Sequence, residues 1–151
     1  MKKNKRQIRD IELIEKELHN THVGVLALYE DEKVLQIPTT FLYLDKNIYI
    51  FLEDEEIYDT LHFDSQASFA LIKNDKPRKN SKQENRSTYH ALSITITGNL
   101  RKVDEQKLDE IKSGFLKKYS NNGDESEIID LNDKAVIIDS EEIQAFEETG
   151  G

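Results

Sequence analysis

Residues 89–100, which read YHALSITITGNL, decide the fold class of this chain. Apolar residues at 92, 94 and 96 alternate with serine or threonine at 93, 95 and 97. A period of two predicts a half-buried antiparallel strand, with one face on a core and the other face toward solvent. The remaining segments are therefore interpreted around one long antiparallel strand.

The rest of the chain supplies further strands and helices. Short apolar runs predict strands over 23–29, 34–43, 48–52, 67–72 and 135–138, while apolar spacings of three and four predict helices over 8–19, 53–63 and 104–119. Polar turns join the first three strands into an antiparallel meander. Pro38 places the second of them at an edge or a bulge, because proline donates no hydrogen bond to a ladder.

This order of elements favours a mainly β fold with peripheral helices. The strands mostly follow one another directly, which is typical of an antiparallel barrel rather than a doubly wound parallel sheet. The length of 151 residues fits a single domain over 1–151. We expect a basic N-terminal tail at 1–7 and an acidic C-terminal tail at 140–151, both mobile.

Composition narrows the classes of function. The chain has no cysteine, which excludes disulfides and thiolate chemistry and fits a cytoplasmic protein. A net charge of −9 argues against nucleic acid as a partner, and no apolar run approaches the ~18 residues of a membrane span. We therefore expect neither nucleic acid nor a membrane as a partner.

Charge is unevenly distributed along the chain. Residues 124–151 hold ten acidic residues and one lysine, so they carry the whole negative surplus. Residues 53–56 place four acidic residues at the start of a predicted helix, where the helix dipole favours them. Residues 73–86 form a basic loop, which is either simply solvated or a binding site for an anion.

The histidines give only weak signals. His19 and His22 are three residues apart, but no third ligand follows at a useful spacing, so capping or surface roles are favoured over a metal site. His90 beside Tyr89 could line a ligand pocket, or could face water at the end of its strand. The usual phosphate-loop and hydrolase motifs are missing, and no catalytic residue is assigned.

Several segments together resemble one known family. The segments VGVLA at 23–27, PTTFLY at 38–43, IYIF at 48–51, ASFA at 67–70, the strand at 89–98, the helix at 107–119 and AVII at 135–138 are similar to those of the pyridoxamine 5'-phosphate oxidase-like proteins. These are the FMN-binding split barrels, which include nitroimidazole-resistance reductases and general stress flavoproteins. The resemblance covers nearly the whole chain.

The resemblance implies a six-stranded antiparallel split β-barrel that forms a homodimer, with FMN at the dimer interface. It implies an FMN-dependent oxidoreductase acting on an unknown small molecule. The implied cofactor-binding residues on one chain are Thr39, Thr40, Phe51, Leu52, Ile57 and Thr60, with Tyr89 and His90 from the partner chain. The flavin would carry the redox chemistry, and the protein would position it.

One position departs from the family pattern. Relatives that bind FMN commonly place Ser, Arg or Lys near the phosphate, where this chain has Glu55, Glu56 and Ile57. A like-charge contact at ~4 Å costs on the order of 4 kcal/mol at an effective dielectric constant near 20.

Three interpretations of this departure stay open. The basic loop 73–86 of the partner chain supplies the missing cations, or the chain is a non-catalytic dimeric split barrel that has lost FMN. In the third, the barrel holds another anionic cofactor, haem or a deazaflavin, with His90 involved.

Overall fold

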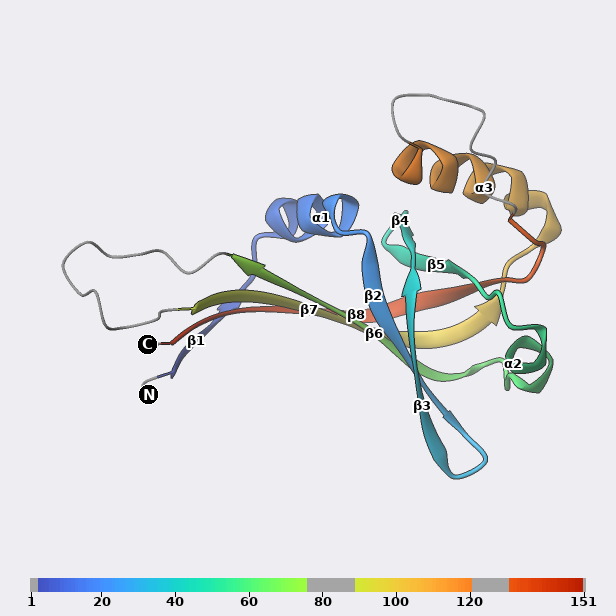
Figure 1. Cartoon of the computed structure of the whole chain (residues 1–151), viewed down its shortest axis with the longest axis horizontal. Coiled ribbons are helices and arrows are strands. Elements are labelled where there is room, and N and C mark those ends of the chain that lie inside the picture. Colours follow the sequence, from blue (N-terminus) through green and yellow to red (C-terminus); the bar gives the residue numbers. More distant parts are fainter. Residues whose placement is uncertain (1–2, 76–88, 121–130, 151) are drawn as a thin grey trace.

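The computed structural model describes residues 3–75, 89–120 and 131–150, which form a curled antiparallel sheet with helices packed around it (Figure 1). The strands are β1 (Lys3–Ile8), β2 (Val23–Glu30), β3 (Lys33–Thr40), β4 (Leu42–Leu44), β5 (Asn47–Phe51), β6 (Ser65–Asp75), β7 (Tyr89–Lys102) and β8 (Ala135–Gly150). The helices are α1 (Ile11–Asn20), α2 (Glu55–Thr60) and α3 (Glu105–Tyr119). The predicted mainly β fold, a split antiparallel barrel with peripheral helices, is confirmed.

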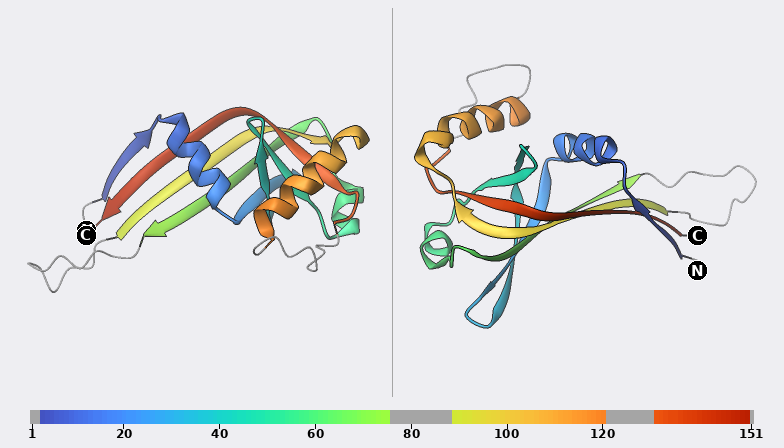
Figure 2. Two further views of the ribbon diagram at one scale, coloured as in Figure 1. Left: turned by 90° about the horizontal axis from the view of Figure 1, so that it is seen from above. Right: turned by 180° about the vertical axis from the view of Figure 1, so that it is seen from behind.

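The sheet is organised around its two longest strands, β7 and β8. The strands are hydrogen bonded in the order β3-β2-β6-β7-β8-β5-β4, and β1 also pairs with β8. The first residues of β8 pair with β5, and its last residues pair with β1. Figure 2 shows the resulting twist and places α1 and α3 on the side of the sheet where β4 and β5 lie.

The main core lies between the inner face of the sheet and α1. Ile94 and Ile96, the apolar half of the alternation on β7, are buried there together with Ile14 and Leu18 of α1. Burying one such side chain stabilises the fold by roughly 1.5–3 kcal/mol.

A second, smaller core lies under α3. There Phe115 packs edge-on against Phe51 of β5, with ring centroids 4.9 Å apart. Ile50, the residue before Phe51 on β5, belongs to the main core, so neighbouring residues of this strand point into different cores.

Two predictions about the strands were wrong. Over the described residues the sheet has eight strands instead of six, because the run at 34–43 divides into β3 and β4 and because residues of the expected N-terminal tail form β1. The expected C-terminal tail at 140–151 forms the second half of β8, up to Gly150. Charged residues occupy these strands because opposite charges face each other across the pair, as Lys5 and Glu148 do.

The predicted meander is also wrong beyond its second strand. β5 pairs with β4 and β8 instead of β3, and the chain turns away from the ladder at Phe41. The backbone N–H of Phe41 donates to the Tyr119 hydroxyl at 3.0 Å, and its carbonyl accepts from the Lys118 ammonium at 3.1 Å. The edge position predicted from Pro38 is confirmed, since β3 is the outermost strand on its side.

The helices begin at aspartates, as expected for N-caps. Asp10 caps α1 by accepting from the N–H of Glu12 and Leu13, and Asp54 caps α2 in the same way. The predicted cap Asp104 stands at the start of α3 but makes no side-chain capping bond. Within the described ranges, no helix has both the length and the apolar character needed to cross a membrane.

A bulge at Gly98 divides β7 and β8 into two parts. The register shifts between Thr97 and Gly98, and a Cβ on Gly98 would lie 2.0 Å from the carbonyl oxygen of Asp139. Glycine is therefore required where the two backbones approach. On one side of the bulge β8 pairs with β5, and on the other side it extends to pair with β1.

Candidate functional site

The cofactor-binding residues predicted for one chain lie around β3, β5 and α2. Phe51 and Leu52 are buried, so their side chains support the surface rather than form it. The Leu52 backbone is engaged as well, because its N–H donates to the Lys134 carbonyl at 3.1 Å. Thr40 and Thr60 are exposed and are the polar side chains of this set that a ligand could reach.

Thr39 and Ile57 are intermediate cases. Thr39 is half-buried and its hydroxyl donates to the neighbouring Thr40 carbonyl at 3.1 Å. Ile57 packs against the main core. Neither side chain is fully available at the surface.

Tyr89 and His90 lie at the opposite end of the sheet. Tyr89 pairs with Gly150 and His90 pairs with Thr149, near the chain termini, whereas α2 lies at the other end of β7 (Figure 1). One chain therefore does not bring these two residues together with α2. Their predicted contact with a cofactor on another chain stays a prediction.

Two lysines lie beside α2, where the sequence predicted no cation. Lys134 lies 5.1 Å from the ring centroid of Tyr58 and 3.7 Å from the Asp59 carboxylate. Lys102, at the end of β7, lies 5.9 Å from the same ring and 5.6 Å from that of Phe63. Positive charge therefore lies beside a helix whose first turn carries the exposed Glu55 and Glu56.

The basic loop 73–86 can be followed only at its start. Lys73 belongs to β6, whose last residue is Asp75. Residues 76–86 lie outside the described residues, so the proposed role of this loop in supplying cations stays a prediction.

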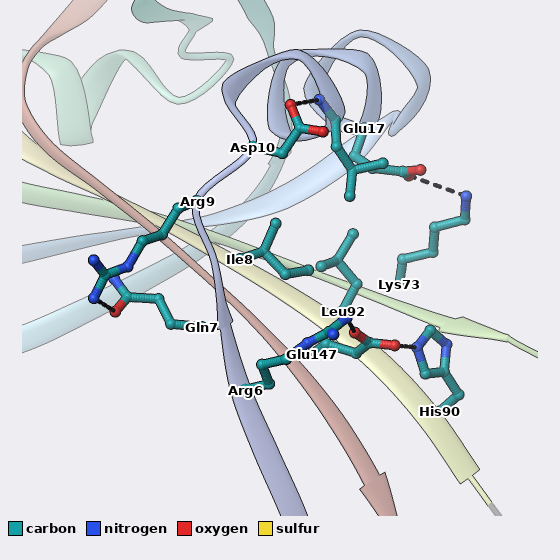
Figure 3. Close-up of a pocket in the computed structure, with 11 residues that line it drawn as sticks. Arg6, Gln7, Ile8, Arg9, Asp10, Glu17, Lys73, His90, Leu92 and Glu147 are labelled. Atoms are coloured by element: carbon teal, nitrogen blue, oxygen red, sulfur yellow. Dashed lines mark hydrogen bonds and ion pairs between the residues drawn. The ribbon is translucent and has the colours of Figure 1, made fainter.

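A cleft of about 560 Å³ lies beyond the main core, between β1, α1 and the ends of β6, β7 and β8 (Figure 3). Its lining residues are Arg6, Gln7, Ile8, Arg9, Asp10, Leu13, Glu17, Lys73, His90, Leu92 and Glu147. This volume is within the range of small-molecule sites, roughly 300–1,000 Å³.

Three of the lining residues form a hydrogen-bonded chain across adjacent strands. The Glu147 carboxylate of β8 lies 2.6 Å from His90 Nε2 of β7, and its other oxygen accepts from Arg6 of β1 (Figure 3). The hydrogen bond from His90, followed by that from Arg6, lowers the pKa of Glu147. The carboxylate therefore stays ionised and holds both partners in place.

A second ion pair borders the cleft on the side of α1. The Lys73 ammonium donates to the Glu17 carboxylate at 3.0 Å. Glu17 is the buried member, with its side chain 12% exposed, and the Lys73 side chain is 48% exposed. A buried carboxylate requires such a partner, because burying an uncompensated charge is costly.

His19 and His22 each contact a tyrosine. The ring of His19 packs edge-on against Tyr43 at 5.4 Å, and the carbonyl of His22 accepts from the Tyr119 hydroxyl at 2.7 Å. In the described part of the chain, no three His, Asp or Glu side chains gather as a candidate metal site.

The sequence did not indicate most of the cleft. Only His90 and Lys73 were singled out, because the residues come from four separate strands and a helix. Arg6 and Glu147 are far apart in the sequence, and only the strand register places them opposite each other. Without that register, no local pattern connects them.

Comparison with solved structures identifies the class of fold. A protein from Bacteroides thetaiotaomicron assigned to 5-nitroimidazole antibiotic resistance aligns with a TM-score of 0.75 at 11% identity, covering 100% of this chain and 93% of that one. An FAD-binding protein from Mycobacterium smegmatis aligns at 0.69 and 14% identity, covering 97% and 100%. An FAD- and haem-binding protein from M. smegmatis aligns at 0.61 and 14% identity, covering 92% and 71%.

These likenesses define the fold as a split barrel, and a sequence comparison identifies the family. The model of the pyridoxamine 5'-phosphate oxidase family matches residues 10–146. The chain therefore belongs to this family, as the resemblance predicted. No protein with a curated function matches the sequence significantly.

Proposed function

We propose that this chain is a flavin-binding protein of its family that acts, as a homodimer, as an FMN-dependent oxidoreductase on a small molecule. The observation that carries the proposal is the family match over residues 10–146. The likeness of the fold to an FAD-binding protein over 97% of this chain supports it.

The residues beside α2 fit an anionic cofactor. Lys102 and Lys134, which both lie close to the Tyr58 ring, would hold the phosphate. The exposed hydroxyl of Thr40 would donate a hydrogen bond to a polar edge of the ligand, and that of Thr60, which already donates to the Ile57 carbonyl, would accept one. When bound, the flavin accepts or donates the electrons of the reaction.

An uncovered apolar face of the sheet supports the proposed homodimer. Val23, Tyr29, Val34 and Ile72 are each more than half exposed. By strand register, Val34 is opposite Tyr29 and all four lie on the face away from the main core. An exposed apolar face of this kind is typical of an interface. A second chain on it would also supply Tyr89 and His90 to a site that one chain leaves incomplete.

The test is a titration of the protein with FMN and with FAD, followed by quenching of flavin fluorescence. We expect saturable binding of FMN. Lys102→Gln combined with Lys134→Gln should weaken it at least tenfold, because two charge-assisted hydrogen bonds are lost. Lys107→Gln combined with Lys117→Gln, two lysines of α3, is the matched control and should leave binding unchanged.

The opposite change is a second arm of the same test. Glu56→Arg combined with Ile57→Lys adds positive charge at α2 and should strengthen FMN binding. If the unmodified protein binds neither flavin and this variant does not gain binding, the flavin proposal is wrong.

The second candidate is a dimeric split barrel that has lost the cofactor and acts as a binding protein. The exposed carboxylates of Glu55 and Glu56 at the start of α2 favour it. It predicts no binding of FMN by the unmodified protein and a dimer in solution. The third interpretation, haem or a deazaflavin, predicts instead that one of these binds and that His90→Ala weakens the binding.

A further inference from the structure

The inner face of the sheet changes from buried apolar residues to mainly charged residues between two successive positions on each strand. Leu71, Ile94 and Ala145 lie opposite one another on β6, β7 and β8 and are buried in the core. Two residues further along each strand, the same face carries Lys73, Leu92 and Glu147, and Arg6 of β1 is opposite Glu147. Because the strands continue while the core ends, these residues form the floor of the cleft.

Two of the three carboxylates that line the cleft, Glu17 and Glu147, lie behind its cations, while the third, Asp10, is exposed and caps α1. Glu147 is 26% exposed at its side chain and Arg6 is 78% exposed, and the same order holds for Glu17 and Lys73. Both carboxylates already accept hydrogen bonds from these partners. The donors of Arg6 and Lys73 are therefore the charged groups that a ligand in the cleft would meet first.

An apolar surface lies between the two charged groups. Ile8 of β1 and Leu92 of β7 lie between the Arg6–Glu147–His90 chain and the Glu17–Lys73 pair (Figure 3). Leu13 of α1 also lines the cleft and is one of the exposed large apolar residues of the protein. A ligand that covered these side chains would remove apolar surface from water.

We propose that this cleft binds a small organic anion, with its ring or apolar body on Ile8, Leu13 and Leu92 and its carboxylate or phosphate on Arg6 and Lys73. Such a ligand matches the 560 Å³ volume, the apolar surface of Ile8, Leu13 and Leu92, and the partly exposed cations together. A cation would instead meet the positive charges of Arg6 and Lys73, and the exposed carboxylate of the lining, Asp10, already accepts hydrogen bonds as the cap of α1.

This site is separate from the proposed flavin contacts of the same chain. Those contacts lie around β3, β5 and α2, at the other end of the sheet. Only His90 belongs to both sets, and it would contact the flavin of a partner chain. The cleft proposal therefore does not depend on flavin binding, which visible absorbance reports independently.

The test is isothermal titration of the full chain with three probes. 2-Naphthoate has both an apolar body and a carboxylate, 2-naphthamide has the same body without charge, and acetate has the charge without the body. We expect saturable binding of 2-naphthoate, binding of 2-naphthamide about tenfold weaker, and no detectable binding of acetate.

Two variants test whether 2-naphthoate binds in the cleft. Arg6→Met keeps an apolar stem and removes the charge of an exposed residue. Leu13→Glu puts a carboxylate on the apolar surface of the cleft, and because Leu13 is exposed, we expect this variant to fold. Each should weaken 2-naphthoate binding about tenfold or more. Arg101→Met, which removes an exposed arginine paired with Asp64 and Asp139, is the control and should bind normally.

Circular dichroism of each variant verifies folding before the titration. The proposal is overturned if 2-naphthoate does not saturate a site or if the amide binds equally well. It is also overturned if Arg6→Met and Leu13→Glu, both folded, bind 2-naphthoate as the unmodified protein does.

Discussion

The two halves of β6, β7 and β8 share one hydrogen-bond ladder and differ in what lies on their inner face. In one half Ile94 is buried under α1, and in the other half Leu92, on the same strand and face, borders an open cleft. The ladder is continuous between them. The two parts therefore differ in their side chains and in their cover by α1, and not in their backbone pairing.

The largest expected effect is a loss of stability in the buried, apolar half of the sheet. Ile94→Ala should lower the free energy of unfolding by about 2–5 kcal/mol, since it deletes buried methyl groups and leaves a cavity. Leu92→Ala, two residues away, should cost less than half as much because its site is already open. Urea denaturation of both variants measures the two values, and equal losses would contradict the division.

Lys118 of α3 allows a second test on the side of the core, because its ammonium packs on the buried ring of Phe41. Burial lowers the pKa of Lys118 from 10.5 to about 8. The unfolded chain then binds more protons than the folded one between these values, so this group makes stability rise with pH across that window. Solvent screening reduces this effect, because the side chain is partly exposed. Across this window we expect the free energy of unfolding of the unmodified protein to rise by about 1–2 kcal/mol more than that of Lys118→Met.

Denaturation at several pH values measures this gain. The control is Lys117→Met, which removes the neighbouring exposed lysine of α3 and should keep the slope of the unmodified protein. If the unmodified protein and Lys118→Met have parallel stability curves between pH about 8 and 10.5, the assignment fails.

The smallest expected effect concerns the cleft half. The pKa of Glu147 is lowered by His90 and Arg6, so its contribution to stability is present above its ordinary value of 4.5 and is lost as pH falls through the lowered value. Glu147→Gln should therefore be less sensitive to acid than the unmodified protein. Acid titrations followed by circular dichroism compare them, and identical acid midpoints would refute the expectation.

Much of the fold could be predicted from the sequence, because its strands and helices carry clear periodicity. The alternation in β7 and the apolar spacing of α3 both predicted their elements closely. β1 and the second half of β8 could not be predicted, because their residues are mainly charged and polar. What makes them strands is pairing with each other and with β7, which is a long-range property.

The candidate sites were less predictable than the fold. The sequence places Glu55 and Glu56 at the start of a helix but gives no sign that Lys102 and Lys134 lie beside that helix. Likewise, the ion pair of Arg6 with Glu147 joins residues near the two ends of the chain. Charges brought together by strand register leave no local pattern in the sequence.

The visible absorption spectrum of the protein as purified tests the central claim, flavin binding, most directly. The account predicts the two absorption bands of an oxidised flavin, either as isolated or after addition of FMN and removal of the excess by gel filtration. It also predicts that the flavin elutes with a protein dimer. A colourless protein that retains no flavin after this treatment would contradict the account.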